Sequence, residues 1–384
     1  MKDKKKIMVF IDWYVPGFKA GGPIRSVFNI VSALKEEYNF FILTSAYDLG
    51  EENPYKDIEL NQWNDVDGVL IKYLDKDHIK NAVIKHNVDE IDPDLLYVNG
   101  IFSRYFSILP IRIGRTKKIK TIVAPRGMLG DGALDVKKFK KNLFLKYSKF
   151  TKMFENVTWH ASTDLESAEI KKIFGEKAAI RISINIPSPQ TLKMGQISKL
   201  KKYDEIKLVY VGRLSPKKNL HLLIDWIQKF SYTKKTILEI WGESSEKEYV
   251  DELHQIIKPN SKVEIQFKGA ANPMELPQIY ASSHYFILMT KHENYGHVIA
   301  EALSNGCPVI ISDKTPWRDL QTKGIGWDID IDENQFLKTL DKAIKMDPID
   351  YNKMAQNAFN YFKEHVYGPE VIASNKQLFE DEGN

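Results

Sequence analysis

Short apolar runs rich in β-branched and aromatic residues recur along the chain and alternate with stretches of helical periodicity. This alternation is typical of an α/β protein in which helices cover a parallel sheet. The near-continuous hydrophobicity of the runs favours strands that are buried on both faces. The runs expected to form strands are Ile7–Asp12, Phe40–Ser45, Val69–Leu74, Leu95–Asn99, Thr121–Pro125, Thr158–Ser162, Ala179–Ser183, Lys207–Val211, Ile237–Trp241, Glu264–Phe267, Tyr285–Met289, Pro308–Ser312 and Gly326–Ile329.

The length of the chain and one polar segment divide it into domains. A chain of 384 residues is too long for one ordinary core. Residues 191–205 are polar, lack a clear period and follow two prolines, which indicates a linker. We therefore expect Rossmann-like domains over residues 1–190 and 206–347. Residues 348–384 should form helices that pack back toward the N-terminal domain.

The composition narrows the cellular context. Hydrophobic residues make up 43% of the chain and charged residues 28%, which is typical of a globular protein. The single cysteine, Cys307, excludes a disulfide framework and a cysteine metal site. Asp12 interrupts the first apolar run, which argues against a signal peptide, and no run reaches the ~20 residues of a membrane span. We expect a cytoplasmic protein, with peripheral attachment to the inner face of the membrane as a further expectation.

Seven lysines between Leu134 and Phe154 alternate with apolar side chains at helical spacing, which predicts a basic amphipathic helix. These lysines are Lys137, Lys138, Lys140, Lys141, Lys146, Lys149 and Lys152. One interpretation is a solvated lysine face above a buried apolar face. The other is attachment to anionic lipid headgroups, at about 1 kcal/mol per well-placed lysine. No recognisable nucleic-acid module surrounds the run, so we expect no nucleic-acid partner.

Two glycine-containing loops follow expected strands, where parallel sheets bind ligands. Gly21 and Gly22 directly precede a helix start, whose backbone N–H groups and dipole attract anions. Gly212, Arg213 and Lys218 follow a later strand, and two cations beside a helix start can hold a diphosphate. Each loop also has a purely structural explanation, as a chain reversal or as a solvated basic turn. The first loop lacks the glycine spacing of the dinucleotide fingerprint.

A third segment has a glutamate at each end. Glu293 is expected in a loop and Glu301 on the helix that follows, where a carboxylate can accept both hydroxyl hydrogens of a ribose diol. Gly296 lets backbone amides approach a phosphate. Two glutamates at this spacing are common by chance, so only the full string is informative. Its intervening site candidates are Asn294, Tyr295, Gly296 and His297.

The combined motifs resemble the retaining glycosyltransferases of family 4. The residues that carry the resemblance are Gly212-Arg213, Lys218-Asn219, Glu293-x-Tyr-Gly and Glu301-Ala302-Leu303, with further similarity at Gly21-Gly22, Pro125–Leu129 and Thr315–Leu320. The resemblance covers about residues 7 to 345. It implies the α/β GT-B architecture, in which two Rossmann-like domains face each other across a cleft, with a helical C-terminus.

The resemblance also implies roles for these residues. Arg213 and Lys218 would bind the donor diphosphate, Glu301 the ribose, and Glu293 the transferred sugar. The amides of Asn294–His297 would contact sugar and phosphate, and Gly22 would touch the diphosphate from the N-terminal domain.

The first domain departs from the pattern of several relatives. Where they carry a histidine, this chain has Arg126. His160 is a second candidate on the acceptor side, and its alternative is a histidine satisfied near the core. Glu293, Arg213 and Lys218 are the residues expected to act in catalysis.

The resemblance therefore predicts transfer of a sugar from a nucleotide-diphosphate-sugar to a hydroxyl of a glycan or lipid-linked acceptor. Retention of configuration and a role in surface polysaccharide biosynthesis are part of this expectation. The nucleotide-sugar is a substrate, and no cofactor or metal is expected because side chains supply the cations. The alternatives are a sugar-nucleotide epimerase on the same fold and a non-enzymatic sugar-binding module of two domains.

Overall fold

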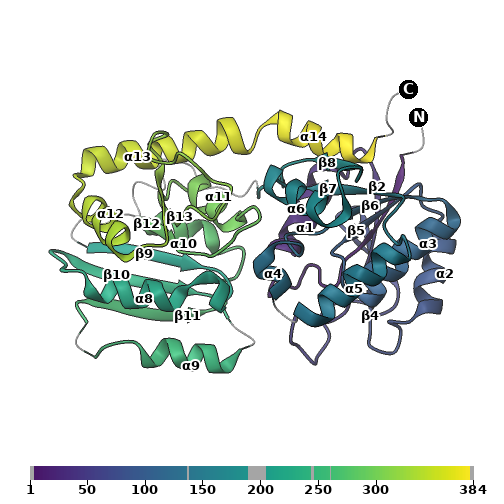
Figure 1. The fold of residues 1–384 in the computed structure, drawn as a ribbon, viewed down its shortest axis with the longest axis horizontal. Coiled ribbons are helices and arrows are strands. Elements are labelled where there is room, and N and C mark those ends of the chain that lie inside the picture. The colour runs from purple at the N-terminus through teal and green to yellow at the C-terminus, as the bar shows by residue number, and fades with distance from the viewer. Residues whose placement is uncertain (1–3, 136–137, 189–204, 244–245, 260, 381–384) are drawn as a thin grey trace. The chain divides into compact units, whose positions relative to one another are not determined.

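The computed structural model describes residues 4–135, 138–188, 205–243, 246–259 and 261–380. These residues form two compact units, each with a sheet covered by helices (Figure 1). The first unit comprises Met1–Ile186 and Pro369–Asn384, and the second comprises Pro187–Gly368.

The first unit contains an eight-stranded sheet in the order β3-β4-β2-β1-β5-β6-β7-β8. All its strand pairs are parallel except β3 with β4. Central strands such as β5 are buried at every position, as their uninterrupted apolar sequence predicts. The strands are β1 (Lys6–Phe10), β2 (Asn39–Ser45), β3 (Trp63–Val66), β4 (Val69–Leu74), β5 (Leu95–Asn99), β6 (Lys120–Ala124), β7 (Val157–Ala161) and β8 (Ile180–Ile182).

The helices of the first unit lie between successive strands and start at residues that suit a helix end. Pro23 occupies the first turn of α1, and the Thr163 hydroxyl caps α6 by accepting from the Glu166 N–H. The helices are α1 (Gly22–Leu34), α2 (Asn81–Ile91), η1 (Arg104–Ile108), α3 (Leu109–Lys117), α4 (Asp131–Asp135), α5 (Lys138–Phe150) and α6 (Asp164–Phe174).

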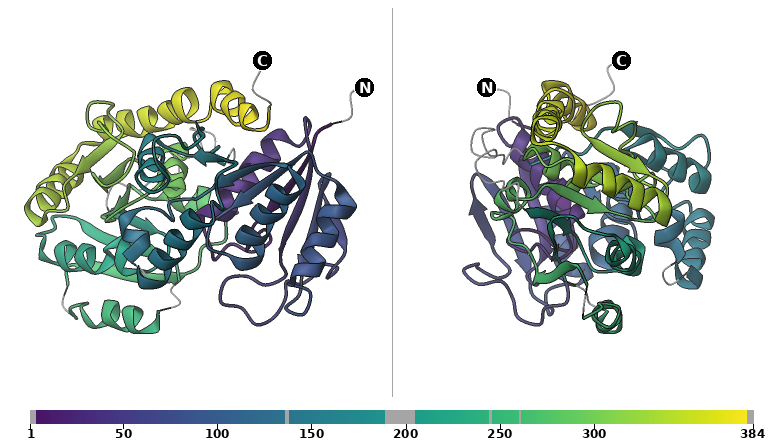
Figure 2. Two further views of the ribbon diagram at one scale, coloured as in Figure 1. Left: turned by 45° about the vertical axis from the view of Figure 1, so that its right-hand side comes forward. Right: turned by 90° about the vertical axis from the view of Figure 1, so that its left-hand side faces the viewer.

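The last helix, α14 (Pro369–Phe379), packs against α1 in the first unit (Figure 2). Phe379 lies edge-on to the rings of Tyr38 and Tyr97, with ring centroids 5.6 and 5.5 Å apart. The Asn375 amide donates to the Ile184 carbonyl at 2.8 Å. These contacts fix α14 to the first unit.

The second unit contains a six-stranded parallel sheet in the order β11-β10-β9-β12-β13-β14. Its strands are β9 (Glu205–Val211), β10 (Lys235–Trp241), β11 (Val263–Gly269), β12 (Tyr285–Leu288), β13 (Val309–Ser312) and β14 (Gly326–Ile329). Its helices are η2 (Pro216–Lys218), α8 (Leu220–Lys229), α9 (Lys247–Gln255), α10 (Leu276–Ser282), α11 (His297–Ser304), α12 (Glu333–Lys345), α13 (Pro348–Tyr361) and η3 (Phe362–Val366).

The structure confirms all thirteen predicted strands and corrects the prediction for the C-terminal segment. Residues 348–384 were expected to form helices that pack back toward the N-terminal domain; α14 belongs to the first unit, whereas α13 belongs to the second. The reason is that Tyr351 of α13 is buried in the core of the second unit, where its hydroxyl donates to the His284 carbonyl at 3.0 Å. The predicted linker 191–205 lies outside the described residues apart from Glu205, which begins β9.

Candidate active site

Two loops of the second unit meet beyond the carboxyl ends of β9 and β12. Lys218 ends η2, which follows β9, and Glu293 lies in the loop between β12 and α11. The Lys218 ammonium donates to the Glu293 carboxylate, and the two side chains are 17% and 18% exposed. The structure therefore brings together two of the three residues expected to act in catalysis.

Backbone hydrogen bonds fix the two loops to each other and to a third. The Lys291 N–H donates to the Lys217 carbonyl at 2.9 Å, which ties the β12 loop to η2. The Glu293 N–H donates to the Lys314 carbonyl at 3.0 Å, and the Ser312 hydroxyl donates to the Thr290 carbonyl at 2.6 Å. The loop after β13 therefore supports the segment that carries Glu293.

The charge of Glu293 follows from its surroundings. Burial opposes ionisation, but the ammonium of Lys218 and the positive charges of Lys217 and His292 hold the pKa of this carboxyl below its usual range. Glu293 is consequently a carboxylate at neutral pH. It is able to accept hydrogen bonds from sugar hydroxyls, and it shares its ammonium partner with any anion that approaches Lys218.

Arg213 provides a second cation on the β9 loop. Its side chain is exposed and makes no hydrogen bond or ion pair with the described residues. Its carbonyl accepts the Tyr210 hydroxyl at 2.9 Å, which fixes the backbone beneath it. Gly212, just before it, donates its N–H to the Trp241 carbonyl at 3.0 Å. A held backbone with an exposed guanidinium suits recognition of an anion.

Gly296 shapes the start of α11. It has φ +81, and a Cβ at this position would lie 2.8 Å from the Ile299 side chain and 3.1 Å from the Glu293 side chain. Glycine is thus required both by the conformation and by the space. The N–H groups in the first turn of a helix have no acceptor within the helix, so they favour a negative charge in front of it.

The other candidates of this segment are packed inside the unit. Tyr295 and His297 are buried, with ring centroids 4.9 Å apart. The Trp317 indole donates to the Tyr295 carbonyl at 2.5 Å. Asn294 is half-buried beside them. Their aromatic contacts position the backbone between Glu293 and Gly296.

Glu301 lies on α11, where the Tyr280 hydroxyl of α10 donates to its carboxylate at 3.4 Å. The carboxylate is half-buried rather than enclosed. This arrangement leaves an oriented acceptor on the helix that begins at Gly296. The partner Tyr280 was not predicted, because nothing in the sequence links α10 to α11 before the fold is known.

Asn219 is a feature that sequence reasoning left without a role. It has φ +53, is fully buried, and neither polar atom of its side chain has a hydrogen-bond partner among the described residues. Asparagine tolerates this left-handed conformation better than most residues. It therefore allows η2 to end at Lys218 and α8 to begin at Leu220.

In the first unit, Gly21 and Gly22 lie at the start of α1, as predicted. Gly21 has φ +71 with open space around its Cα. The loop before it is held by Asp48, whose carboxylate accepts the N–H groups of Phe18 and Lys19 at 2.8 and 3.2 Å. The loop is therefore ordered by its own unit, and the backbone at Gly21 remains accessible.

Arg126 and His160 belong to one buried network at the carboxyl ends of β5 to β8. Arg126 donates to Asn99 at 2.7 Å, to the Tyr97 hydroxyl at 2.6 Å and to Asn185. The Tyr97 hydroxyl lies 2.8 Å from Nδ1 of His160, and Nε2 of His160 lies 2.8 Å from the Ser183 carbonyl. Since a carbonyl only accepts, Nε2 carries the proton and Nδ1 accepts from Tyr97.

His160 has the environment of a core histidine whose two ring nitrogens are both hydrogen-bonded. The residue is 1% exposed. Burial and the nearby Arg126 guanidinium lower the pKa of His160 to about 3, so the ring is neutral near pH 7. The guanidinium of Arg126 is held by three side-chain acceptors. Both residues thus hold the strand ends in place.

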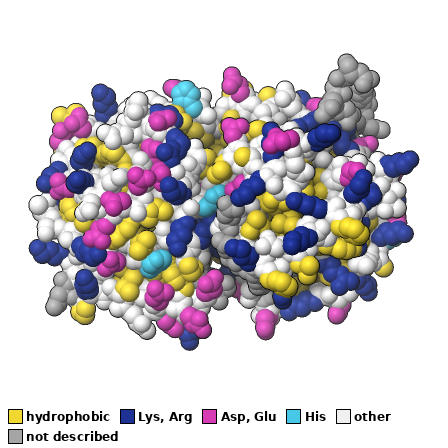
Figure 3. Space-filling view, in the orientation of Figure 1, with side chains coloured by type: hydrophobic (Ala, Val, Ile, Leu, Met, Phe, Trp, Pro, Cys, Tyr) yellow, Lys and Arg dark blue, Asp and Glu magenta, His cyan; other side chains and the backbone are white. Residues whose placement is uncertain are grey.

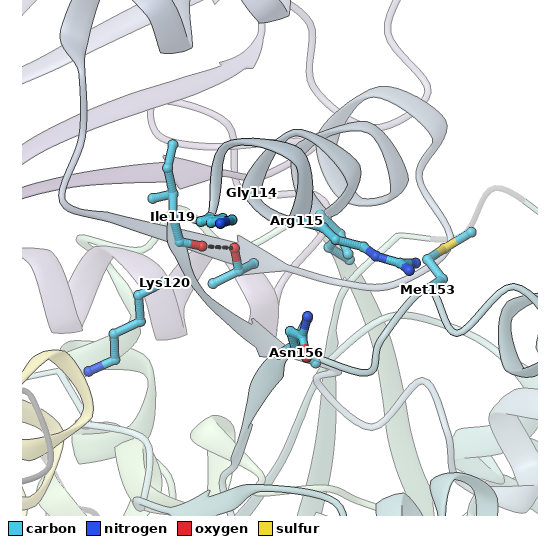
Figure 4. A pocket seen from close by; sticks show the side chains of 10 residues that line it. Gly114, Arg115, Ile119, Lys120, Met153 and Asn156 are labelled. Carbon is cyan, nitrogen blue, oxygen red and sulfur yellow. Dashed lines mark hydrogen bonds between the residues drawn. The ribbon is translucent and has the colours of Figure 1, made fainter.

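A cavity of about 240 Å³ in the first unit lies away from these groups (Figure 4). It is lined by residues such as Gly114, Lys120 and Val157, and the latter two begin β6 and β7. The candidate residues lie at the opposite, carboxyl ends of these strands. We therefore assign the cavity no part in the candidate site.

Two absences concern the described part of the chain. Within it, no helix combines the length and the apolar character needed to cross a bilayer. Within the same residues, no three His, Cys, Asp or Glu side chains cluster in a way that could hold a metal ion.

Comparison with known proteins shows what the fold and the second unit are similar to. Residues 196–361 match the family "Glycosyl transferases group 1". The structure of HepE from Anabaena in complex with UDP and glucose is similar at a TM-score of 0.73 and 17% identity, covering 97% of this chain and 98% of that one. Sucrose-phosphate synthase from Thermosynechococcus elongatus is similar at a TM-score of 0.75 and 15% identity, covering 98% of both chains.

Curated relatives are matched over less of their length. A GDP-mannose-dependent alpha-mannosyltransferase of Mycobacterium tuberculosis is 32% identical over 113 residues, 29% of this chain and 27% of that protein. A 41.2 kDa protein in the cps region of Klebsiella pneumoniae is 21% identical over 242 residues, 60% of this chain and 63% of that protein. The chain thus spans less than two thirds of the length of these relatives.

The fold is GT-B, and the second unit carries a glycosyltransferase group 1 domain. The comparisons therefore show the GT-B fold for the chain and similarity to the glycosyl transferases group 1 for residues 196–361. Its site residues Gly212, Arg213, Lys218, Glu293 and Glu301 all fall within the matched region.

Proposed function

We propose that the protein transfers a sugar from a nucleotide-diphosphate-sugar to an acceptor hydroxyl, with retention of configuration at the anomeric carbon. The observation that carries the proposal is the contact between Lys218 and Glu293, which joins a basic loop to a carboxylate loop at one sheet edge. A diphosphate would bind the cations, and a sugar attached to it would lie beside the carboxylate. The complexes of HepE with UDP and UDP-glucose support this class of donor.

The proposed roles follow from the charges in the reaction. As the anomeric C–O bond breaks, negative charge grows on the departing diphosphate. Arg213, Lys218 and the amides at the start of α11 would stabilise it, and a single such donor is typically worth about 3–4 kcal/mol. Glu301, oriented by Tyr280, would accept the two ribose hydroxyls. Because side chains provide the positive charge, the proposal requires no metal.

Retention is proposed to occur by attack on the face that the diphosphate leaves, with the leaving phosphate taking the proton of the acceptor hydroxyl. No protein nucleophile is needed in this scheme. Glu293 as a covalent nucleophile is the alternative, and trapping of a glycosyl-enzyme would identify it. The ion pair supports the first scheme, because a carboxylate held by an ammonium is a weaker nucleophile than a free one.

The acceptor is proposed to be a glycan or a lipid-linked glycan in surface polysaccharide assembly. Support comes from WaaG, a glycosyltransferase involved in lipopolysaccharide biosynthesis, which is similar at a TM-score of 0.69 and 15% identity over 98% of this chain and all of that one. In the first unit, Gly22 would reach the diphosphate. The Arg126 and His160 network would position the loops on the acceptor side. A cytoplasmic location at the inner membrane face is part of the same proposal.

Thermal-shift screening against UDP, GDP and ADP and their sugars tests the donor site. A ligand at about 100 times its dissociation constant should stabilise the protein by about 2.7 kcal/mol. Product analysis with and without added acceptors then separates the alternatives. An epimerase would convert the nucleotide-sugar without an acceptor, and a binding module would leave it intact. Either result would overturn the proposed transfer.

A further inference from the structure

Helix α5 presents an apolar stripe to solvent. Phe139, Leu143, Tyr147 and Phe150 are 80%, 59%, 49% and 88% exposed. They are spaced by four, four and three residues, which places them along one side of the helix. The opposite side packs on the unit through the buried residues Leu145 and Ser148. A row of four large exposed hydrophobic side chains on one helix indicates an interaction surface.

Positive charge borders this stripe. Lys138, Lys140, Lys146 and Lys149 are all exposed. The last three have no ion-pair partner anywhere in the described ranges. Figure 3 shows hydrophobic side chains interleaved with Lys and Arg side chains over this region of the first unit. Lys137 lies outside the described residues.

The neighbouring helix α3 adds to the same charge. Arg112 donates to the Tyr147 hydroxyl at 3.3 Å, and Arg115 donates to the carbonyls of Thr151 and Lys152 at 3.1 and 3.2 Å. Both arginines are exposed. The stripe therefore lies in a field of cations from two helices, with its rings directed outward.

We infer that α5 lies in the interface of an anionic lipid bilayer, with the apolar stripe inserted among the acyl chains and the lysines on the headgroups. Long lysine side chains can keep the ammonium at the headgroups while their stems follow the apolar surface. A helix of this kind lies in the plane of the interface, with its apolar face buried by about 5–10 Å. The inference adds hydrophobic insertion to the charge attraction expected from the sequence.

Charge complementarity favours a lipid surface over a second copy of the chain. Two copies that met through this face would bring the lysines of both into proximity, and like charges at an interface are unfavourable. Anionic headgroups instead neutralise every lysine around the stripe. This surface is independent of the proposed function, because α5 belongs to the first unit and the donor residues belong to the second.

Co-sedimentation of the full chain with vesicles tests the inference. The probes are vesicles of phosphatidylcholine alone and of phosphatidylcholine mixed with phosphatidylglycerol. The stripe variant carries Phe139→Gln, Leu143→Gln and Phe150→Gln, and the charge variant carries Gln at Lys138, Lys140, Lys146 and Lys149. The matched control is Met274→Gln with Ile349→Gln, which removes exposed apolar side chains from the second unit.

The wild type should bind the anionic vesicles, and part of this binding should persist at high salt because insertion is not screened. The stripe variant should lose at least tenfold in partitioning at every salt concentration. Each lysine replaced should cost about fivefold at low salt. The control should bind like the wild type, and the nucleotide-induced thermal shift should be unchanged in all variants.

Three outcomes would overturn the inference. One is a wild type that does not sediment with anionic vesicles. The second is a stripe variant that binds as well as the wild type. The third is a concentration-dependent dimer, seen by sedimentation velocity without vesicle binding, that the stripe variant abolishes. A loss of the nucleotide thermal shift in the wild type would instead count against the proposed function, so the two failures are distinguishable.

Discussion

The ammonium of Lys218 and the carboxylate of Glu293 form an ion pair between the loop after β9 and the loop after β12. Both side chains are mostly buried, so their attraction is screened less than that of a surface pair. If Lys218 binds the donor diphosphate, then phosphate and carboxylate compete for one ammonium. The pair therefore couples the affinity for the nucleotide to the charge on Glu293.

This coupling makes Glu293→Gln and Lys218→Met behave in opposite ways. Lys218→Met removes a charge-assisted contact, so the affinity for the nucleoside diphosphate should fall by about 10- to 100-fold. Glu293→Gln releases the ammonium, so the affinity should rise while kcat falls by about a hundredfold. Arg213→Ala should weaken binding without affecting Glu293. Calorimetric titration gives the affinities and initial rates give kcat.

The double variant provides the control for this pair. If the two residues act through the shared ammonium, Glu293→Gln should no longer raise the affinity once Lys218 is methionine. Additive effects in the cycle, or wild-type affinity and rate in both Lys218→Met and Arg213→Ala, would remove the diphosphate assignment. Circular dichroism spectra matching the wild type would exclude loss of folding as the cause.

Glu301 is predicted to bind the ribose. Its substitution should therefore change the donor KM and the selectivity for the ribose, which a general loss of activity would not do. Glu301→Ala should mainly raise the donor KM, because ribose contacts persist from the ground state to the transition state. The variant should also stop discriminating between the nucleotide and its 2′-deoxy form. Glu248→Ala, which removes an exposed carboxylate from α9, is the matched control. Unchanged discrimination in Glu301→Ala would assign the ribose to other residues.

The buried imidazole of His160 predicts a loss of stability in acid. Its pKa of about 3 in the fold is below its value near 6.5 in the unfolded chain. Between these values the unfolded chain binds more protons, so the free energy of unfolding falls as pH decreases, by up to about 1.4 kcal/mol per pH unit. His160→Gln, which keeps a donor for the Ser183 carbonyl, should be less stable at pH 7 but should show a shallower decrease.

Urea unfolding at a series of pH values between 6.5 and about 4 measures this difference in slope. Equal slopes in wild type and variant would mean that the ring takes up a proton over the same pH range in the folded and the unfolded protein. Such a result would return His160 to the candidates for proton transfer.

Most strands were predictable because a buried parallel strand is marked by its local apolar sequence, but the strand β3 and the direction of α5 were not predicted. The hairpin strand β3 was missed because only Trp63 and Val66 in it are apolar. The signal that could have found it is Asp67-Gly68, which have φ +55 and +79, as a two-residue hairpin turn requires.

The direction of α5 could not be predicted from its periodicity. Its apolar residues lie on more than one side, so the sequence does not say which side meets the sheet. Lys141, expected at the surface, instead donates to the Ala133 carbonyl at 2.6 Å and lies over the Phe102 ring. The interpretation with a buried apolar face is therefore wrong for Phe139, Leu143, Tyr147 and Phe150. The residues of the motifs were predictable from the sequence. The ion pair between Lys218 and Glu293 was not, because the two residues are 75 positions apart and only the fold brings them together.

Gly242 is predicted to control the donor loop although it carries no side chain. It directly follows β10, and a Cβ on it would lie 1.9 Å from the carbonyl oxygen of Gly212. Gly242→Ala must push apart the backbones after β9 and β10. This would weaken the bond from the Gly212 N–H to the Trp241 carbonyl and move Arg213. We expect a loss of about 1–3 kcal/mol in stability and a weaker affinity for the nucleotide.

Gly132→Ala is the matched control for this substitution, because Gly132 is helical and a Cβ there meets nothing within 4 Å. It should be neutral or should raise stability by up to about 1 kcal/mol, as expected for alanine in a helix. Urea unfolding and calorimetric titration of both variants make the comparison. The role of the close approach is contradicted by a Gly242→Ala protein with wild-type stability and affinity. A variant that loses stability but keeps full affinity would show that the close approach stabilises the pairing of β9 with β10 but does not determine the position of Arg213.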